Sequence, residues 1–243
     1  MKNRQKIRKT ALYISLVLFP LTFYYLSPVL ILESSYFGIV NASAIIFVLL
    51  LLTSIFLGRL WCGWVCPGGG LGEACFKIRD KRVSDKFNWV KYLIWLPWLI
   101  TIVYLVLRSG GYHQVVFFYQ TFYGLSISGP QSIIAFIIVL AIITIPNLVF
   151  GRRAMCHFLC WMSPFMIIGQ KIGDTLRLPR VRLVSDKSQC INCMTCTKNC
   201  PMSLEVNQMV QKGDMTNSEC ILCGTCVDTC PKQVIRYTFS KKK

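Results

Sequence analysis

Long stretches without a charged residue constrain this chain more than any other feature. Residues 10–32 and 34–58 are uncharged, and two further apolar runs cover residues 89–107 and 131–149. Crossing about 30 Å of hydrocarbon takes about 20 apolar residues in a helix. The four runs therefore predict four transmembrane helices. The composition agrees, because only 15% of the residues are charged, whereas about 25% are charged in soluble domains.

The basic residues lie almost entirely on one side of these predicted helices. Of the 27 Lys and Arg residues, 26 lie in the N-terminal tail, in the loop after the second run or from Arg152 onward, and only Arg108 lies on the other side. Since cytoplasmic loops are rich in Lys and Arg, we expect a multi-pass protein of a prokaryotic (inner) cell membrane with both termini in the cytoplasm. Lys91, at the edge of the third run, is expected to reach the interface. Membrane topology thus accounts for the net charge of +17, and no nucleic-acid partner is expected.

A short pattern in the chain occurs twice, and its cysteines repeat at an offset of 94 residues. In each half, two predicted spans are followed by a glycine, an arginine and a pair of cysteines. The two copies are Gly58-Arg59 before Cys62 and Cys66, and Gly151-Arg152 before Cys156 and Cys160. Two hairpins of equal orientation form parallel repeats about an axis along the membrane normal. Such repeats would bring the two cysteine pairs together at the cytoplasmic surface.

Eight further cysteines lie in the C-terminal tail, in two copies of C-x2-C-x2-C-x3-C-P that are 30 residues apart. In this bacterial ferredoxin run the fourth cysteine ligates the other cluster. We therefore expect two [4Fe–4S] clusters in a small α+β ferredoxin-like domain, because zinc modules favour paired cysteine elements. The predicted ligands are Cys190, Cys193, Cys196 and Cys230 for cluster one, and Cys220, Cys223, Cys226 and Cys200 for cluster two.

The membrane cysteine pairs leave several alternatives open. Each pair is spaced i, i+4, which places both thiols on one face of a helix. Together they could hold a metal ion or a further iron–sulfur cluster, act as two redox dithiols, or only pack. The nearby Arg59, Arg152 and Arg153 are expected to lower the pKa of these thiols and so favour the thiolate. Cys75 has no partner in either pattern and is interpreted as structural.

The two histidines and the outer loop give weaker signals. His157, inside the second cysteine pair, is expected to hydrogen-bond at the interface rather than to bind metal. The loop Tyr112 to Gly124 is rich in aromatic residues and contains His113. It could stack on a quinone, but an interfacial aromatic belt is the preferred interpretation.

Taken together, these motifs resemble the membrane-bound 4Fe–4S polyferredoxins, which include NapH-like, NosR C-terminal and CcoG-like proteins. The resemblance covers residues 48–237 and rests on four spans, the segment GRLWCGWVCP, a second cysteine pair and the two-cluster tail. One departure is that Trp161 follows Cys160 where the family's C-x3-C-P pattern has proline, which here arrives at Pro164. The resemblance implies electron transfer between a membrane quinone pool or a redox partner protein and the cytoplasmic clusters, as in the NapH-like component of a quinol-oxidising oxidoreductase.

The expected organisation is a four-helix transmembrane domain over residues 1–183 and a ferredoxin domain with a basic tail over residues 184–243. Two alternatives to electron transfer remain open. One is a CcoG-like reductase of a metal such as copper, or an assembly factor for a metalloenzyme, because soft thiolates suit Cu(I). The other is a regulator whose clusters sense the redox state. The sequence specifies neither the donor and acceptor nor the direction of electron flow.

Overall fold

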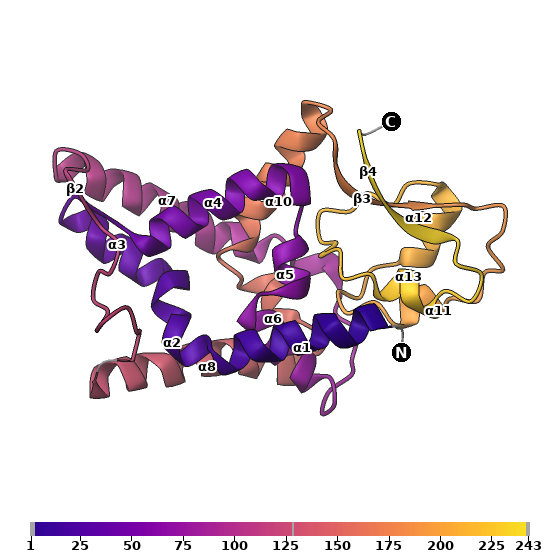
Figure 1. The fold of residues 1–243 in the computed structure, drawn as a ribbon, viewed down its shortest axis with the longest axis horizontal. Helices are drawn as coiled ribbons and strands as arrows, with labels where there is room; N and C mark the ends of the chain where they lie inside the picture. Colours follow the sequence, from indigo (N-terminus) through magenta and orange to yellow (C-terminus); the bar gives the residue numbers. More distant parts are fainter. Residues whose placement is uncertain (1–2, 128, 242–243) are drawn as a thin grey trace.

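The computed structural model describes residues 3–127 and 129–241. Helices dominate it, and Figure 1 shows a larger helical part beside a smaller C-terminal tail drawn in orange and yellow. The helical part comprises α1 (Asn3–Val17), α2 (Phe19–Thr22), η1 (Phe23–Leu26), α3 (Pro28–Tyr36), β1 (Ile39–Asn41), α4 (Ala42–Leu57), α5 (Leu60–Trp64), α6 (Pro67–Cys75), η2 (Asp85–Phe87), α7 (Val90–Arg108), β2 (Gln114–Val116), α8 (Pro130–Phe150), α9 (Ala154–Phe158) and α10 (Ser163–Thr175). The tail comprises β3 (Arg180–Ser185), α11 (Thr195–Lys198), α12 (Val206–Lys212), α13 (Thr225–Thr229) and β4 (Ile235–Ser240).

Within the described residues, the helices that contain α7 and α8 are long and apolar enough to cross a membrane. A third candidate is the pair Asn3–Val17 and Phe19–Leu26, which is bent by 60°, and the apolar helix α4 is shorter than the other two. The run 10–32, predicted as one helix, is instead divided among α1, α2, η1 and α3. Its prolines explain the breaks, since Pro20 and Pro28 lie in the first turn of α2 and α3 and a proline cannot continue a preceding helix.

Helix α4 packs closely along α10, a helix that the sequence did not identify as its partner. A Cβ atom at Gly169 would lie 2.0 Å from the Ser54 Oγ, and one at Gly173 would lie 2.4 Å from the Ile55 carbonyl oxygen. The two glycines are four residues apart and so share a helix face, which is the small-residue spacing that lets two helices approach closely. This contact fixes the element that follows the second cysteine pair against the first half of the chain.

The repeat seen in the sequence recurs as local structure. Each of α4 and α8 ends at a glycine with positive φ, Gly58 at 57° and Gly151 at 115°. A five-residue helix follows in both halves, α5 and α9, and the two short helices are 94 residues apart. A proline then lies in the first turn of the next helix, α6 or α10. Glycine adopts positive φ without steric cost, so the chain can turn just before the short helix in each half. The arrangement as two parallel hairpins remains a prediction.

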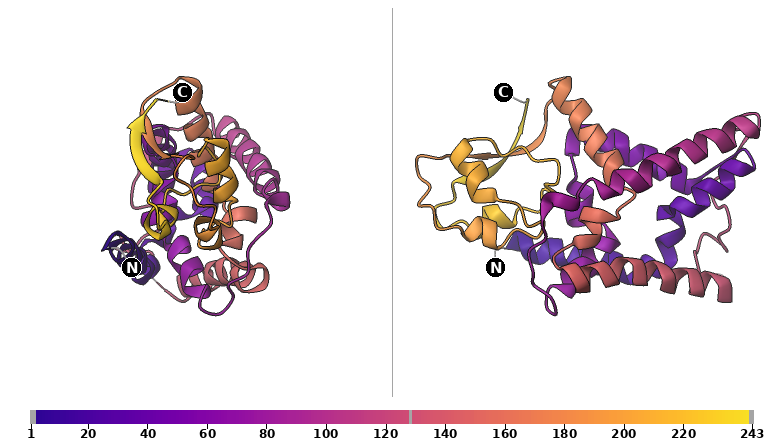
Figure 2. Two further views of the ribbon diagram at one scale, coloured as in Figure 1. Left: turned by 90° about the vertical axis from the view of Figure 1, so that its right-hand side faces the viewer. Right: turned by 180° about the vertical axis from the view of Figure 1, so that it is seen from behind.

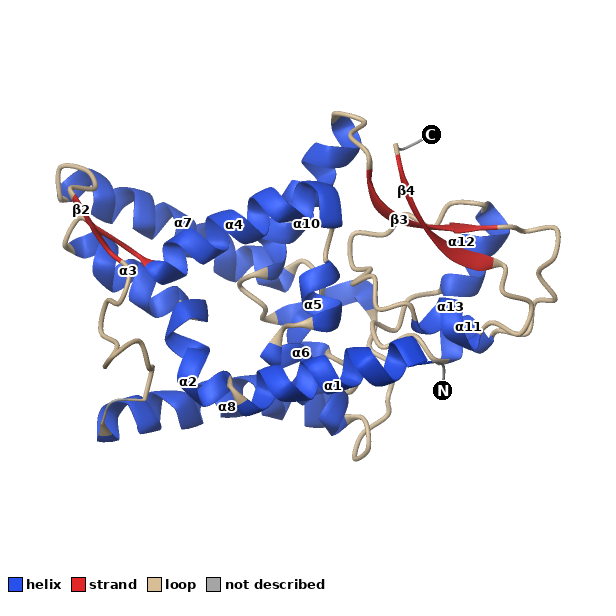
Figure 3. Cartoon of the chain, in the orientation of Figure 1, coloured by secondary structure: helices blue, strands red, loops and turns tan. Residues whose placement is uncertain are grey.

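The tail is a small α+β unit at one end of the helical part (Figure 3). Its strands β3 and β4 are antiparallel, with Arg180 opposite Ser240. Strand β3 therefore lies across the domain boundary predicted between residues 183 and 184. The view from behind in Figure 2 shows the N-terminal end of α1 beside the tail, where Arg4 pairs with Asp228 at 2.6 Å. Strands β1 and β2 pair at the opposite end of the helical part.

Candidate cysteine centres

The two cysteine runs of the tail fold into loops of the same backbone conformation. Asn192 and Met194 have positive φ in the first loop, and Leu222 and Gly224 have positive φ in the second. These positions correspond at the offset of 30 residues. Alternation of ordinary and left-handed residues turns successive amide N–H groups toward one side, which makes a concavity that binds anions. Each loop then continues into a short helix, α11 or α13.

The loops bring the eight tail cysteines together as two groups of four. Each group lines a small cavity and combines three cysteines of one run with the last cysteine of the other. The first group is Cys190, Cys193, Cys196 and Cys230, and the second is Cys200, Cys220, Cys223 and Cys226. These are the two crossed sets that the spacing predicts, and four thiolates are the ligand set of a [4Fe–4S] cluster.

No group of three or more His, Cys, Asp or Glu side chains in the described part of the chain is arranged to hold a metal ion. A structural zinc ion needs its ligands around one centre. The thiolates of a cluster bind different iron atoms, so their sulfurs stand further apart.

The two tail groups differ in the burial of their cysteines and therefore in the pKa of their thiols. Cys193 of the first group is exposed, and hydrogen bonds from Thr195 lower its pKa. In the second group, burial raises the pKa of Cys200 to about 12 and that of Cys220 to about 11. A buried thiol of this kind ionises when a metal supplies the opposing charge. The second group is therefore the protected inner site, and the first group is the outer site that faces solvent.

The four membrane cysteines are also close neighbours. Cys66, Cys156 and Cys160 line a common cavity, and Cys66 interacts electrostatically with each of the other three thiols. The Cys62 sulfur lies 3.4 Å from that of Met166 on α10. The structure thus brings together the two pairs that are 94 residues apart.

The charge state predicted for these thiols is wrong in one respect. Burial raises the pKa of Cys66, Cys156 and Cys160. Arg153 and Arg59 lower the pKa of Cys156, and Arg59 lowers that of Cys160, but burial outweighs them. The sequence shows that arginines lie near these cysteines, but it does not show that the sulfurs lose contact with water. This loss disfavours the charged thiolate in a low-dielectric site.

Arg59 connects the helical part to the tail through a buried ion-pair group. Its Nη1 lies 2.8 Å from a carboxylate oxygen of Glu219, and the Lys91 Nζ lies 2.5 Å from the other oxygen. Lys91 is 1% exposed, so the expectation that it reaches the interface is wrong. It fails because the sequence did not show that Glu219, next to Cys220, would lie against the start of α7.

A second buried group surrounds Glu73. Arg8 of α1 and Arg153 both pair with this carboxylate, at 2.5 and 2.7 Å, and Arg153 Nη1 also donates to the Cys62 carbonyl oxygen at 2.8 Å. Arg153 lies three residues before Cys156, as Arg59 lies before Cys62. It is therefore the structural counterpart of Arg59, whereas the sequence had assigned Arg152, which pairs with Asp80 near the surface.

Each ion-pair group contains two cations and one carboxylate, so positive charge remains in excess beside the membrane thiols. Among the described residues, Arg59 Nε and Nη2 and Arg153 Nε are buried without a hydrogen-bond partner. Arg59 interacts electrostatically with Cys62 and Cys160, and Arg153 with Cys156. Unpaired buried donors are costly, and an anionic centre held by four thiolates would satisfy both the donors and the charge. The residues present therefore fit an iron–sulfur cluster.

The first membrane pair lies directly against the inner tail loop. A Cβ atom at Gly63 would be 2.3 Å from the Ile221 carbonyl oxygen and 3.4 Å from the Cys223 Cα. Trp64 Nε1 donates to the Leu222 carbonyl oxygen at 3.1 Å. Only glycine fits at this position, and the contact places the membrane cysteines and the second tail group back to back.

The remaining candidates take structural positions. His157 is buried, and its Nδ1 lies 2.7 Å from the Asn88 Oδ1. Burial lowers the pKa of His157 to about 4, so it is neutral, as expected for a hydrogen-bonding role. Cys75 is buried near the end of α6. His113 is exposed and does not line the cavity beside the membrane cysteines.

Comparison with protein-family models agrees with the two kinds of cysteine centre. A model described as "4Fe-4S binding domain" matches residues 42–84 and 131–178, and one described as "4Fe-4S dicluster domain" matches residues 182–231. The first match includes one membrane cysteine pair in each of its segments. The chain contains 4Fe–4S ferredoxin-type domains. This coarser assignment agrees with the resemblance noted from the motifs, while membership of the NapH, NosR or CcoG group stays a prediction.

Known proteins show distant similarity along most of the chain. MJ0750 of Methanocaldococcus jannaschii is 24% identical over 86% of this chain and 85% of its own length. YccM of Escherichia coli (strain K12), whose name describes it as a candidate electron transport protein, is 27% identical over 70% of this chain and 49% of its own length. The ferredoxin-type protein MauN of Methylobacillus flagellatus, named for methylamine utilization, is 23% identical over 60% and 50%. No solved structure matches the chain significantly. These similarities support iron–sulfur electron transfer.

Proposed function

We propose that this chain is a membrane-anchored electron-transfer protein that connects a membrane quinone pool with a redox partner protein in the cytoplasm. Cys190, Cys193, Cys196 and Cys230 would hold one [4Fe–4S] cluster, and Cys200, Cys220, Cys223 and Cys226 a second. Cys62, Cys66, Cys156 and Cys160 would hold a third centre of the same kind. A [4Fe–4S] cluster, when bound, accepts and donates single electrons.

The contact between Gly63 and Ile221 carries this proposal. It joins the membrane ligand set to the inner tail set, and the crossed loops join the inner set to the outer one. The three sets therefore form a row from the helical part to the solvent-exposed Cys193. A metal-handling factor would instead be expected to bind a single ion at Cys62, Cys66, Cys156 and Cys160.

The membrane arrangement belongs to the same proposal. Four segments within residues 10–149 would lie in the bilayer as two hairpins of parallel orientation, with α7 and α8 as complete spans. Both termini would face the cytoplasm, on the side with 26 of the 27 basic residues. In support, the N-terminal end of α1 lies against the tail (Figure 1), where Gln5 Nε2 donates to the Cys223 carbonyl oxygen at 3.0 Å.

Iron content tests the number of centres. The protein, purified without oxygen, is expected to contain about twelve irons per chain, and the double variant Cys62→Ser/Cys156→Ser about eight, as three and two [4Fe–4S] clusters require. Cys75→Ser, which removes another buried thiol, should keep about twelve. Eight irons in the unsubstituted protein would overturn the third centre, and an iron-free tail would overturn the whole proposal.

Electron entry is tested separately. Anaerobic addition of a reduced quinone to the protein in lipid vesicles should bleach the visible absorption of the clusters. The double cysteine variant should keep its tail clusters but lose this reduction. Unchanged reduction in that variant would show that electrons enter without the membrane cysteines.

A further inference from the structure

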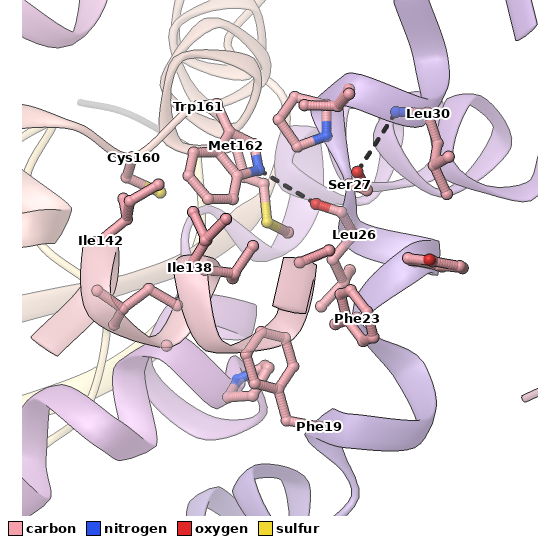
Figure 4. A pocket seen from close by; sticks show the side chains of 18 of the residues that line it. Phe19, Phe23, Leu26, Ser27, Leu30, Ile138, Ile142, Cys160, Trp161 and Met162 are labelled. Atoms are coloured by element: carbon pink, nitrogen blue, oxygen red, sulfur yellow. Dashed lines mark hydrogen bonds between the residues drawn. The ribbon is translucent and has the colours of Figure 1, made fainter. Parts of the chain in front are cut away.

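A cavity of about 430 Å³ lies between the segment 19–33 and helix α8. Figure 4 shows its wall, which Phe19, Phe23 and Leu26 form on one side and Ile138 and Ile142 of α8 on another. Its volume is within the range of small-molecule sites, which are mostly apolar clefts of about 300–1,000 Å³. Most of the residues that line it are not among the proposed ligands of the cysteine centres.

One side of the cavity is formed by the membrane cysteine site. Cys66, Cys156 and Cys160 belong to its wall, and in Figure 4 Cys160 lies on the side away from Leu30. Trp161 follows Cys160, and its indole Nε1 donates to the Leu26 carbonyl oxygen at 3.2 Å. This hydrogen bond holds the indole ring as a fixed flat surface beside the thiols.

The cavity also has access from the lipid-facing surface. Ile138 and Ile142 line it, yet they are 54% and 41% exposed. Both belong to α8, the most apolar candidate membrane span. A ligand that passes these side chains therefore arrives from hydrocarbon, so it must be soluble in lipid.

We propose that this cavity binds a lipid-soluble quinone, with the ring against Trp161 beside Cys160 and the apolar tail leaving past Ile138. A flat ring suits a wall of aromatic rings and sulfur atoms, because rings stack with offset and sulfur makes favourable contacts at ring edges. A phospholipid acyl chain has no such ring. The inference rests on the proposed function, since a redox carrier beside the thiols serves an electron-transfer protein.

Photolabelling with an azido-quinone tests the location directly. Labelled protein with intact clusters, digested and mapped by mass spectrometry, should carry the label within residues 19–33, 131–145 or 155–162. Label confined to residues 112–119 of the aromatic loop, or scattered over the lipid-facing helices, would overturn the proposal. This measurement on the unsubstituted protein does not depend on the folding of any variant.

A matched pair of substitutions on α8 tests the cavity itself. Ala135 lines the cavity, whereas Ala141 on the same helix does not. Ala135→Phe fills the space and should weaken labelling, measured as the half-saturating quinone concentration, by about tenfold or more. Ala141→Phe adds the same side chain and should change it less than about twofold. Equal effects of the two variants would contradict the proposal.

Two further measurements distinguish a failure of the quinone site from a failure of the proposed function. Iron content and the visible spectrum are recorded on the same samples. Intact clusters without saturable labelling would overturn the quinone site alone, whereas missing iron would overturn the proposed function. Native mass spectrometry should show the quinone bound, and a retained phospholipid that quinone does not displace would identify the cavity as a lipid site and overturn the inference.

Discussion

The tail cysteines are positioned by local loop geometry, whereas the membrane cysteines are positioned by contacts between distant parts of the chain. In the tail, three of the four ligands in each group come from one run of seven residues, and equivalent left-handed residues shape both loops. In the helical part, the two pairs meet only because glycines, buried arginines and α10 fix the two halves against each other. The tail cysteine groups can thus be predicted from cysteine spacing, whereas the grouping of the membrane cysteines depends on packing between distant segments.

The largest expected effect is the loss of one tail cluster when one of its cysteine ligands is replaced. Cys200→Ser should remove the inner cluster, about four of the eight tail irons, although Cys200 follows the outer triplet in sequence. Cys193→Ser should remove the outer cluster instead. Anaerobic iron analysis with electron paramagnetic resonance distinguishes the two, and loss of the outer cluster in Cys200→Ser would refute the crossed arrangement.

The next effect is expected at a buried arginine of the membrane site. Arg153→Met leaves Glu73 with one cation fewer in a buried site, and breaking such a group costs about 3–5 kcal/mol. Denaturant unfolding in detergent measures this free energy.

Arg82→Met supplies the matched control for that substitution. Arg82 pairs with Glu205 at 2.7 Å, but both side chains are more than a third exposed. Surface pairs contribute about 0–1 kcal/mol. Similar losses of unfolding free energy in Arg153→Met and Arg82→Met would contradict the expectation that the buried ion pair contributes more than the surface pair.

A smaller effect is expected at the contact between the two regions. Gly63→Ala places a methyl group against the Ile221 carbonyl oxygen, and overpacking of this kind costs about 1–3 kcal/mol. Faster amide hydrogen exchange around Leu222 should report the loosened tail. Gly68→Ala is the control, because its Cβ would meet no atom closer than 3.7 Å.

The smallest effect is a pH dependence. Burial alone would raise the pKa of Glu73, but Arg153 and Arg8 outweigh it and lower the pKa. The ionised carboxylate therefore stabilises the folded protein above the unfolded pKa of about 4.3, and this stabilisation is lost as the pH falls through the lower folded value. The stability difference between the unsubstituted protein and Glu73→Gln should be constant between about pH 6 and 8 and shrink below about pH 4. A difference that grows on acidification would reverse the sign.

The comparison also explains how far the sequence could be interpreted. Spacing alone predicted both tail groups and the repeat of the cysteine pairs. The apolar run 10–32 looked like one helix because hydropathy ignores Pro20 and Pro28 as breaks. Arg152 and Lys91 were misassigned because a charge next to a motif does not reveal which carboxylate will lie beside it.

Some residues of the site carried a signal that went unused. Counting 94 residues from Arg59 leads to Arg153, so the offset of the cysteines could have identified the buried counterpart. Gly169 and Gly173 show the small-residue spacing of a closely packed helix pair. Gly63 and Glu219 had no comparable signal, because their roles arise only when the tail folds against α5.

The lack of space at Gly63 has a consequence for the kinetics of the whole protein. With Leu222 and Cys223 bound to Trp64 and Gln5, the tail cannot act as a tethered carrier that swings between the membrane and a distant acceptor. If the chain has the proposed function, the tail stays in place and the redox partner protein diffuses to it. Turnover should therefore rise with partner concentration until release of the partner limits it, and extra residues inserted between α10 and β3 should not accelerate it.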